Sequence, residues 1–477
     1  MTSAVPKPIW QDALSLCRDL QSGRTQAMDV MANVYDRIEQ INPTINAIVN
    51  LLPRAQAMSL ARAADGVPLE NRGPLHGLPM APKDAVAVSG FPTNWGFRPF
   101  SQPVESKDDP MVSRLRTAGA IFIGHSNMPE FGLGSHTFNA LFGHTLNPYD
   151  LTKTPGGSSG GAAAALAARL LPLADGSDLG GSLRNPASFC NVVGLRPSIG
   201  RMPLNRGFGW YGRLATTGPM ATNLRDLALL FSVMAGPDEA DPMSLDEPGH
   251  AFLDALTPYP TSAPLRVRVS RDLNGLPVES SVTAIVEAAA STFTDLGADV
   301  SYGEPDLTGA MQIFQVQRAA GLRILGQTLD QRLPQWRDEA KDTAIWNIEK
   351  GLALTVDEVL QAELNRTALY ARAAAFFQDV DVLILPAAQV QPFDKNVDWV
   401  RSINGKPMAT YLDWMSICCM ISVTGFPALS IPGGFTENGL PVGIQMVSAP
   451  RQDLHLMRIA HLFEQRTAYA LQRPDLA

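Results

Sequence analysis

The chain is poor in charged residues and has no strongly basic segment. Charged residues make up 18% of its 477 positions, whereas about 25% is usual for a soluble domain. The 38 Lys and Arg are outnumbered by 46 Asp and Glu, which gives a net charge of −8, and no run of Lys or Arg exceeds a pair. Because a nucleic-acid-binding protein needs a basic face for the phosphates, we expect no nucleic-acid partner.

Cysteine and histidine are also scarce, and their spacing fits no metal site. The four cysteines, Cys17, Cys190, Cys418 and Cys419, form no CxxC pair, and the seven histidines form no HExxH motif. Disulfide frameworks and zinc sites are recognised by such patterns. We therefore expect a reducing compartment, no metal and no cofactor.

Long apolar runs are missing as well. The richest one, residues 161–174, is interrupted by Arg169 and Pro172 and is shorter than the roughly 20 residues that a membrane helix needs. Residues 1–20 carry Lys7, Asp12 and Arg18 and lack the apolar core of a signal peptide. These absences predict a cytoplasmic protein without a membrane segment. The hydrophobic content of 45% predicts a large buried core.

The spacing of apolar residues predicts an α/β fold. Helical spacing is found in residues 9–20, 27–41, 223–235, 280–297 and 454–466, and the second of these helices should end at Asn42-Pro43. Short apolar runs predict strands at 75–81, 85–88, 120–124, 168–173, 265–269, 380–385, 428–431 and 442–447, with Asn438-Gly439 in a hairpin between the last two. Helices and strands that alternate along a chain are typical of α/β proteins.

We find no internal repeat and no linker, so residues 1–477 are interpreted as a single domain. Within it we expect N-terminal helices over 1–65 and a catalytic core over about 70–235. A variable, cap-like part should follow over about 240–420, and the chain should return to the core over 421–477.

A glycine- and serine-rich segment, residues 155–161, precedes an alanine-rich helix at 162–171. Glycines before a helix expose backbone N–H groups, so the segment could bind an anion or hold a reactive serine. It lacks the lysine of a Walker A loop, which argues against a nucleotide. Residues 156–160 also match the G-x-S-x-G elbow of α/β-hydrolases around Ser158. That motif needs a strand directly before it, which residues 147–155 do not predict, and a purely structural turn is the further alternative.

Two more segments carry potential chemistry. Residues 176–186 form a second glycine- and serine-rich stretch, whose glycines allow successive backbone amides to point at one spot, as an oxyanion hole requires. The apolar segment 75–84 contains Lys83 near its end. A single lysine is usually solvated, so Lys83 gains meaning only in combination with the other two segments.

Together these segments resemble the amidase signature family. The resemblance is carried by GLPMAPKDAV around Lys83, TPGGSSGGAAAA around Ser158 and GSDLGGSLRNPASFCNVVGLRPS around Ser182, and the intervals between them are also similar to those of the family. INPTINAIV (41–49), SNMPEFG (126–132), LNPYD (146–150) and GFPALSIPGGFTENGLPVGIQMV (425–447) extend it over nearly the whole chain. The fold it implies is a large twisted mixed β-sheet flanked by α-helices on both faces.

The resemblance implies a triad of Ser182, Ser158 and Lys83. Ser182 would be the nucleophile, Ser158, after a cis peptide bond, would relay its proton, and Lys83 would be the base. To act as a base, Lys83 needs burial that lowers its pKa from about 10.4 toward neutrality. Backbone N–H groups of Leu179, Gly180, Gly181 and Ser182 would hold the oxyanion.

Other residues match family positions with supporting roles. We expect Asp178 and Arg184 to fix the loop of the nucleophile, and Ser159 and Ser177 to satisfy local backbone groups. Gly132 to Gly134 align with a strand edge that would contact the substrate. Apart from these family positions, Trp210 lies in an aromatic and glycine-rich segment, 201–218, for which a lid over the acyl pocket and a plain surface loop are the alternatives. Phe314 and Trp346, in the variable part, are further pocket candidates. Leu179 departs from the family pattern, in which Thr is frequent, and Asn185 replaces a usual apolar residue.

The function that follows is hydrolysis of a small-molecule amide, and of esters or carbamates with the same carbonyl geometry, through an acyl-enzyme. An alternative is a protein like the glutamyl-tRNA amidotransferase A subunit, which shares the triad and passes ammonia to a partner. A catalytically inactive scaffold and an α/β-hydrolase with Ser158 as nucleophile are weaker alternatives. We expect a monomer or a homodimer.

Overall fold

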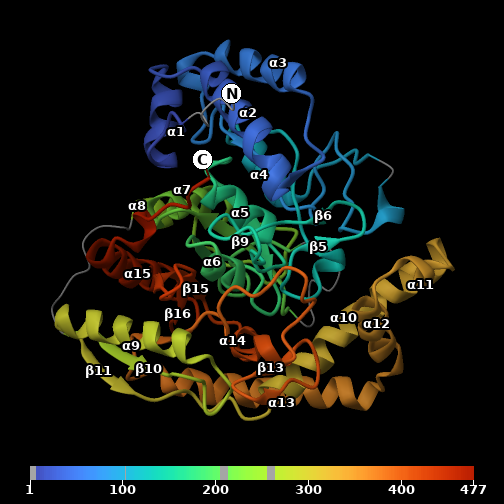
Figure 1. The fold of residues 1–477 in the computed structure, drawn as a ribbon, viewed down its shortest axis with the longest axis vertical. Coiled ribbons are helices and arrows are strands. Elements are labelled where there is room, and N and C mark those ends of the chain that lie inside the picture. The colour runs from blue at the N-terminus through green and yellow to red at the C-terminus, as the bar shows by residue number, and fades with distance from the viewer. Residues whose placement is uncertain (1–6, 102–103, 205–212, 255–263, 477) are drawn as a thin grey trace.

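A computed structural model of the chain describes residues 7–101, 104–204, 213–254 and 264–476. Its centre is an eight-stranded mixed sheet (Figure 1). β10 pairs in parallel with β11 and β12, and the remaining pairs are antiparallel. In spatial order the strands are β11 (Asp299–Tyr302), β10 (Arg266–Val269), β12 (Val382–Pro386), β16 (Pro441–Val447), β15 (Ala428–Phe435), β8 (Val193–Arg196), β9 (Thr216–Ala221) and β7 (Ala174–Asp178).

Helices cover both faces of the sheet, as the α/β prediction requires. Successive residues of a strand point to opposite faces. A Cβ on Gly443 of β16 would lie 2.9 Å from Ser188 Cα in α6 (Arg184–Phe189). Its neighbour Ile444 shares the other face with Gly433 of β15, where a Cβ would lie 3.0 Å from Ile285 in α9 (Ser280–Asp295). α6 and α9 therefore lie on opposite sides of the sheet.

The remaining helices fall into an N-terminal, a middle and a C-terminal group along the chain. The N-terminal group and the helices of residues 310–424 lie at opposite ends of the molecule in Figure 1. The N-terminal part has α1 (Ala13–Ser22), α2 (Ala27–Ile45), α3 (Arg54–Asp65) and α4 (Pro110–Thr117), and the middle has α5 (Gly160–Ala167), α7 (Leu224–Met234) and α8 (Ala251–Asp254). α10 (Ala310–Arg332), α11 (Trp336–Glu339), α12 (Asp342–Ala353) and α13 (Val356–Phe376) precede α14 (Ser416–Thr424) and α15 (Asp453–Thr467). No helix in the described ranges is long and apolar enough to cross a membrane.

Short strand pairs lie outside the central sheet. They are β1 (Ile48–Val49) with β4 (His125–Ser126), β2 (Pro79–Met80) with β3 (Ile121–Phe122), β5 (Phe138–Asn139) with β6 (Gly143–His144), and β13 (Ser402–Ile403) with β14 (Lys406–Pro407). β2 and β3 occupy parts of the strands predicted at 75–81 and 120–124. The predicted helices at 223–235, 280–297 and 454–466 and the C-terminal hairpin are confirmed.

Three predicted elements are wrong. Residues 85–88 form turns instead of a strand, and 168–173 are irregular, because the strand in this region starts only at Ala174. Both runs are largely buried, so their apolar character reflects core packing rather than strand pairing. The helix predicted to end at Asn42-Pro43 continues through Pro43 to Ile45. A proline so close to a helix end removes one hydrogen bond without breaking the helix interior.

α10 and α12 pack closely through glycines. A Cβ on Gly351 of α12 would lie 2.2 Å from the Ala319 carbonyl oxygen of α10, and one on Gly326 would lie 2.3 Å from Ile348 Cγ2. Gly321, on the same helix as Gly326, has no atom of the described residues within 4 Å of the corresponding position. The contact between these two helices therefore depends on the absence of a side chain at Gly351.

Gly351→Ala and Gly321→Ala are expected to change stability in opposite directions. The first drives a methyl group against backbone and should cost about 1–3 kcal/mol, whereas the second fills open space and should stabilise the helix by about 0.5–1 kcal/mol. Urea midpoints of both variants and the parent chain measure the difference. A Gly351→Ala variant that is as stable as the parent chain, or more stable, would contradict the close contact of α10 and α12.

Candidate active site

Lys83 lies in the turn after β2 and points its amine at three serine hydroxyls. Its side chain is 1% exposed. Nζ donates to Ser158 Oγ at 2.7 Å, to Ser177 Oγ at 2.9 Å and to Ser159 Oγ at 3.0 Å. The amine is thus enclosed by hydroxyl groups, and none of its three contacts is to a carboxylate. A backbone bridge between Lys83 and Ser126 holds this part of the chain in place.

Burial lowers the pKa of Lys83 to about 7, although Asp175 and Asp178 act to raise it. Asp175 accepts the backbone N–H of Lys83 at 3.3 Å, and burial raises the pKa of that carboxyl to about 6. Hydroxyl groups cannot neutralise the ammonium charge, so desolvation dominates. Near neutral pH a large fraction of Lys83 is therefore neutral and able to accept a proton.

Ser158 and Ser159 lie between a cis peptide bond and a helix. The Gly157–Ser158 bond is cis, and α5 starts at Gly160, directly after the two serines. Gly157 has no room for a side chain, since a Cβ there would lie 2.9 Å from the His136 backbone nitrogen. The tight approach of glycine backbone to neighbouring loops fixes Ser158 beside Lys83.

Ser182 lies in the loop that connects β7 to α6. Asp178, the last residue of β7, accepts the N–H of Gly181 at 2.8 Å and that of Leu183 at 3.1 Å. The predicted oxyanion role of Gly181 is therefore corrected, because its N–H donates to this carboxylate. The N–H groups of Leu179, Gly180 and Ser182 have no acceptor among the described residues.

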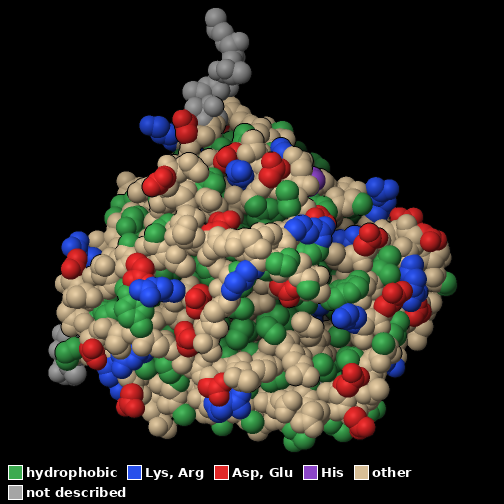
Figure 2. Space-filling model, turned by 60° about the horizontal axis from the view of Figure 1, so that its bottom comes forward, with side chains coloured by type: hydrophobic (Ala, Val, Ile, Leu, Met, Phe, Trp, Pro, Cys, Tyr) green, Lys and Arg blue, Asp and Glu red, His purple; other side chains and the backbone are tan. Residues whose placement is uncertain are grey.

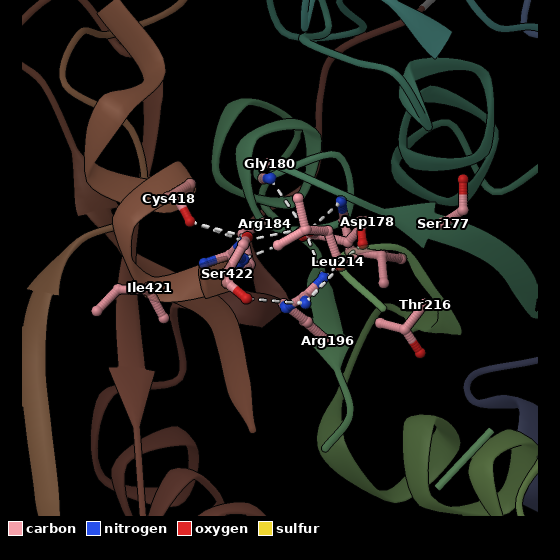
Figure 3. Close-up of polar contacts among 12 residues, drawn as sticks. Ser177, Asp178, Gly180, Arg184, Arg196, Leu214, Thr216, Cys418, Ile421 and Ser422 are labelled. Carbon is pink, nitrogen blue, oxygen red and sulfur yellow. Dashed lines mark hydrogen bonds and ion pairs between the residues drawn. The ribbon is translucent and has the colours of Figure 1, made fainter. Parts of the chain in front are cut away.

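Asp178 is the centre of a buried charge cluster (Figure 3). Arg184 donates to its carboxylate from Nε at 3.0 Å and Nη2 at 2.9 Å. Arg196 Nη1 donates to the Asp178 carbonyl at 2.5 Å and lies 3.4 Å from the carboxylate. Arg184 also reaches Ser422 Oγ of α14 at 2.7 Å and Gln445 Oε1 of β16 at 2.5 Å. The carboxylate thus joins the Ser182 loop to β8 through Arg196, and Arg184 extends this contact to β16 and α14.

Asp178 and Arg184 stabilise each other's charge, whereas burial lowers the pKa of Arg196 to about 10 although Asp178 acts to raise it. Burial by itself would raise the pKa of Asp178, but Arg184 and Arg196 outweigh it and hold that pKa well below its usual range. Burial likewise acts to lower the pKa of Arg184, and Asp178 raises it above its usual value. Two guanidinium groups and a carboxylate with several hydrogen bonds make the cluster a fixed anchor. Asp178 and Arg184 thus have the loop-supporting contacts that we predicted, and Arg196 is an additional member.

A cavity of about 540 Å³ adjoins these residues. It is lined by Gly132, Gly134, Ser158, Ser177, Leu179, Gly180 and Ser182, together with apolar side chains that include Met128, Phe131, Ile199, Met202, Leu214, Phe314, Leu322 and Met415. Ser158 and Ser182 therefore face one cavity, although no hydrogen bond between the two hydroxyls is present in the described residues. Phe314 lines it as predicted, whereas Trp346 does not and instead packs on Tyr411.

The structure bears differently on three further predictions near the cavity. Gly132 belongs to a short 3-10 helix, Glu130–Gly132, and is followed by a loop, so no strand edge is present at 132–134. Ser159 bonds local backbone as predicted, since its hydroxyl accepts from the Ser177 N–H at 3.2 Å and donates to the Ser177 carbonyl at 3.4 Å. In addition, the hydroxyls of Ser159 and Ser177 both accept from Lys83. Trp210 lies outside the described residues, and so does the middle of the lid predicted at 201–218.

The alternative with Ser158 in a nucleophile elbow lacks its structural requirements. Residues 154–157 form no strand before Ser158, and no histidine lines the cavity in the described ranges. His136, close in sequence to the cavity-lining Gly134, bonds the Val397 carbonyl through Nδ1. Within the described ranges no group of three His, Cys, Asp or Glu side chains could hold a metal ion.

Comparisons with known proteins extend over nearly the whole chain. A model of the Amidase family matches residues 29–457. The chain is 33% identical over 473 residues to an acylamidase of Rhodococcus erythropolis, covering 98% of this chain and 97% of that protein. It is 36% identical over 473 residues to the A subunit of the glutamyl-tRNA(Gln) amidotransferase of Thermus thermophilus, covering 94% and 95%. A solved bacterial aryl acylamidase of the amidase signature family matches with a TM-score of 0.89 at 26% identity, covering 97% and 98%.

Proposed function

This chain belongs to the amidase signature family and is an amidase, and from that premise we propose that it hydrolyses the C–N bond of a small-molecule amide through an acyl-enzyme on Ser182. The observation that supports this proposal most is the contact of a buried Lys83, with a pKa of about 7, with the Ser158 hydroxyl at 2.7 Å. Ser158 and Ser182 face the same cavity.

In the proposed reaction, the Ser182 hydroxyl attacks the carbonyl carbon as its proton passes through Ser158 to neutral Lys83. The N–H groups of Leu179 and Gly180 donate to the oxyanion, since both residues line the cavity and both N–H groups lack an acceptor among the described residues. The C–N bond then breaks, and the leaving amine takes the proton back from Lys83 through Ser158. A water molecule cleaves the ester on Ser182 by the same steps and releases the acid.

We infer a small substrate with apolar parts from the cavity lining, in which apolar side chains predominate. Esters and carbamates present the same carbonyl to Ser182, so we propose them as additional substrates. Cytoplasmic location and a monomeric or dimeric state stay predictions. All four cysteines are free and buried, which fits a reducing compartment.

The alternative of an amidotransferase component is favoured by the 36% identity to the A subunit of a glutamyl-tRNA(Gln) amidotransferase. On the face drawn in Figure 2, basic and acidic side chains are interspersed, and no broad basic area is visible there. A glutaminase assay of the purified chain separates the two functions. Release of ammonia from glutamine in preference to simple amides would favour the amidotransferase.

Labelling with a fluorophosphonate tests the triad without knowledge of the substrate. The adduct should map to Ser182, and Ser182→Ala should abolish it. Since neutral Lys83 is the reactive form, the labelling rate should rise about tenfold per pH unit below the Lys83 pKa of about 7 and level off above it. In Lys83→Met the rate should be low and should lose this inflection. An adduct on Ser158 in the parent chain would contradict the proposed roles.

A further inference from the structure

Arg318 is a buried cation at the cavity wall that lacks a carboxylate partner. Its side chain is 6% exposed and lines the cavity. The guanidinium donates from Nη1 to Asn347 Oδ1 and from Nη2 to the Tyr411 hydroxyl. Arg213, also at the cavity wall, has the Asp241 carboxylate at 2.6 Å, whereas no carboxylate in the described ranges pairs with Arg318. Burial of a cation is costly unless an anion compensates it.

Tyr411 adds a second donor at the same place. Its hydroxyl oxygen accepts from Arg318 Nη2 and from Asn347 Nδ2, the latter at 2.7 Å. The hydroxyl proton itself has no acceptor among the described residues, and Tyr411 lines the cavity. Burial raises the pKa of Tyr411, so the hydroxyl stays protonated and remains a donor. Arg318 and Tyr411 thus offer N–H and O–H groups to one anion.

α10 brings Arg318 to the same cavity as the Ser182 loop. Residues 314, 317, 318, 321 and 322 line the cavity, a spacing that places them on one face of a helix. Phe314 touches the loop, because a Cβ on Gly180 would lie 2.7 Å from its ring. Arg318 lies one helical turn further, which is about 6 Å along the axis. Arg318 thus lines the same cavity as the Ser182 loop, on the helix face that touches this loop through Phe314.

We propose that Arg318 and Tyr411 bind a carboxylate of the substrate, so that the enzyme prefers amides that carry a carboxylate. The proposal rests on the proposed amide hydrolysis. Guanidinium groups suit this ligand because their planar N–H groups match the two carboxylate oxygens. Asn347 holds both donors in position, since it bonds Arg318 through Oδ1 and Tyr411 through Nδ2.

Matched pairs of p-nitroanilides test the preference. Succinyl and glutaryl p-nitroanilide carry the carboxylate, and butanoyl and pentanoyl p-nitroanilide are neutral compounds of equal length. We expect a higher kcat/KM for the acids, and in Arg318→Met we expect the ratio of acid to neutral substrate to fall about 10- to 100-fold. Arg318→Lys should keep part of the ratio. Arg332→Met, which removes an exposed arginine of the same helix, should leave the ratio as in the parent chain.

Two results would overturn the proposal: a preference for the neutral compounds, or a ratio that is the same in Arg318→Met and in the parent chain. If Arg318→Met does not fold, Tyr411→Phe provides the same test, because it removes the second donor and keeps the ring. Its ratio should fall too, and an unchanged ratio in both Tyr411→Phe and Arg318→Lys would overturn the proposal.

Binding without turnover separates this site from the proposed reaction. In the Ser182→Ala background, calorimetry should show tighter binding of glutaryl anilide than of pentanoyl anilide, and the difference should disappear when Arg318→Met is added. If this difference in binding is found but the parent chain hydrolyses no amide, the carboxylate site stands and the amidase chemistry proposed for Ser182 is refuted. Hydrolysis of the neutral anilides without any binding preference would refute the carboxylate site alone.

Discussion

Ser182→Ala is expected to lower kcat for amide hydrolysis by up to about a million-fold, the scale seen when a serine hydrolase loses its nucleophile. The variant keeps the cavity and the backbone N–H groups of the loop, so it should still bind substrate and retain a slow background rate. Lys83→Met removes the base and should lower kcat by at least about 10²- to 10⁴-fold. The rate is measured with purified protein and any amide that the parent chain hydrolyses.

The two substitutions should not be additive, because the proposed base acts only through the Ser182 hydroxyl. The double variant should therefore be about as slow as Ser182→Ala alone. Ser198→Ala is a matched control, since Ser198 is also buried and its Oγ has no partner in the part of the chain that the structure describes. It should retain normal activity. A Ser182→Ala enzyme within tenfold of the parent chain, after contamination is excluded, would contradict the assignment of the nucleophile.

Asp178→Asn is expected to destabilise the fold by about 3–5 kcal/mol, the usual cost of removing one partner from a buried ion pair. Arg184 and Arg196 are fully or almost fully buried, and both would keep their charge without the carboxylate. The amide side chain would also present one oxygen and one NH₂ group where two oxygens now accept from Gly181 and Leu183. The Ser182 loop would therefore loosen, and activity should fall together with stability.

Urea unfolding measures this effect, and an exposed ion pair provides the control. Asp398 contacts Arg401 at 2.9 Å, with both side chains more than half exposed. Asp398→Asn should change stability by less than about 1 kcal/mol. A loss below 1 kcal/mol in Asp178→Asn would mean that the cluster relaxes or takes up water, and it would remove the argument that this carboxylate anchors the loop.

The sequence was most informative where a local motif carries the chemistry. Lys83, Ser158 and Ser182 each lie in a segment with a distinctive composition, and the absence of a strand before Ser158 was visible in the chain itself. Strands were less predictable. Residues 168–173 form a buried apolar run outside the sheet, whereas the polar and glycine-containing Ala174–Asp178 segment forms β7. Pairing with β9, which is distant in the sequence, decides which residues become a strand.

Arg196 and Arg318 show what a sequence cannot reveal about a site. Arg196 lies inside the motif around Ser182 without a role that the motif assigns, and Arg318 lies outside every motif. Each gains meaning only from partners far along the chain, such as Ser422 for Arg196 and Tyr411 for Arg318. Ser177 likewise becomes a partner of Lys83 only when β7 packs beside the loop after β2.

The sequence by itself thus determined the α/β class, the family resemblance and the residues of the proposed triad, because these depend on composition and on short motifs. Only the tertiary structure decided that Lys83 is buried with a pKa of about 7, that Gly181 donates to Asp178, and that Arg318 meets the cavity without a carboxylate. The physical reason is that desolvation and charge compensation depend on every group that packs around a side chain, and most of those groups come from distant parts of the chain.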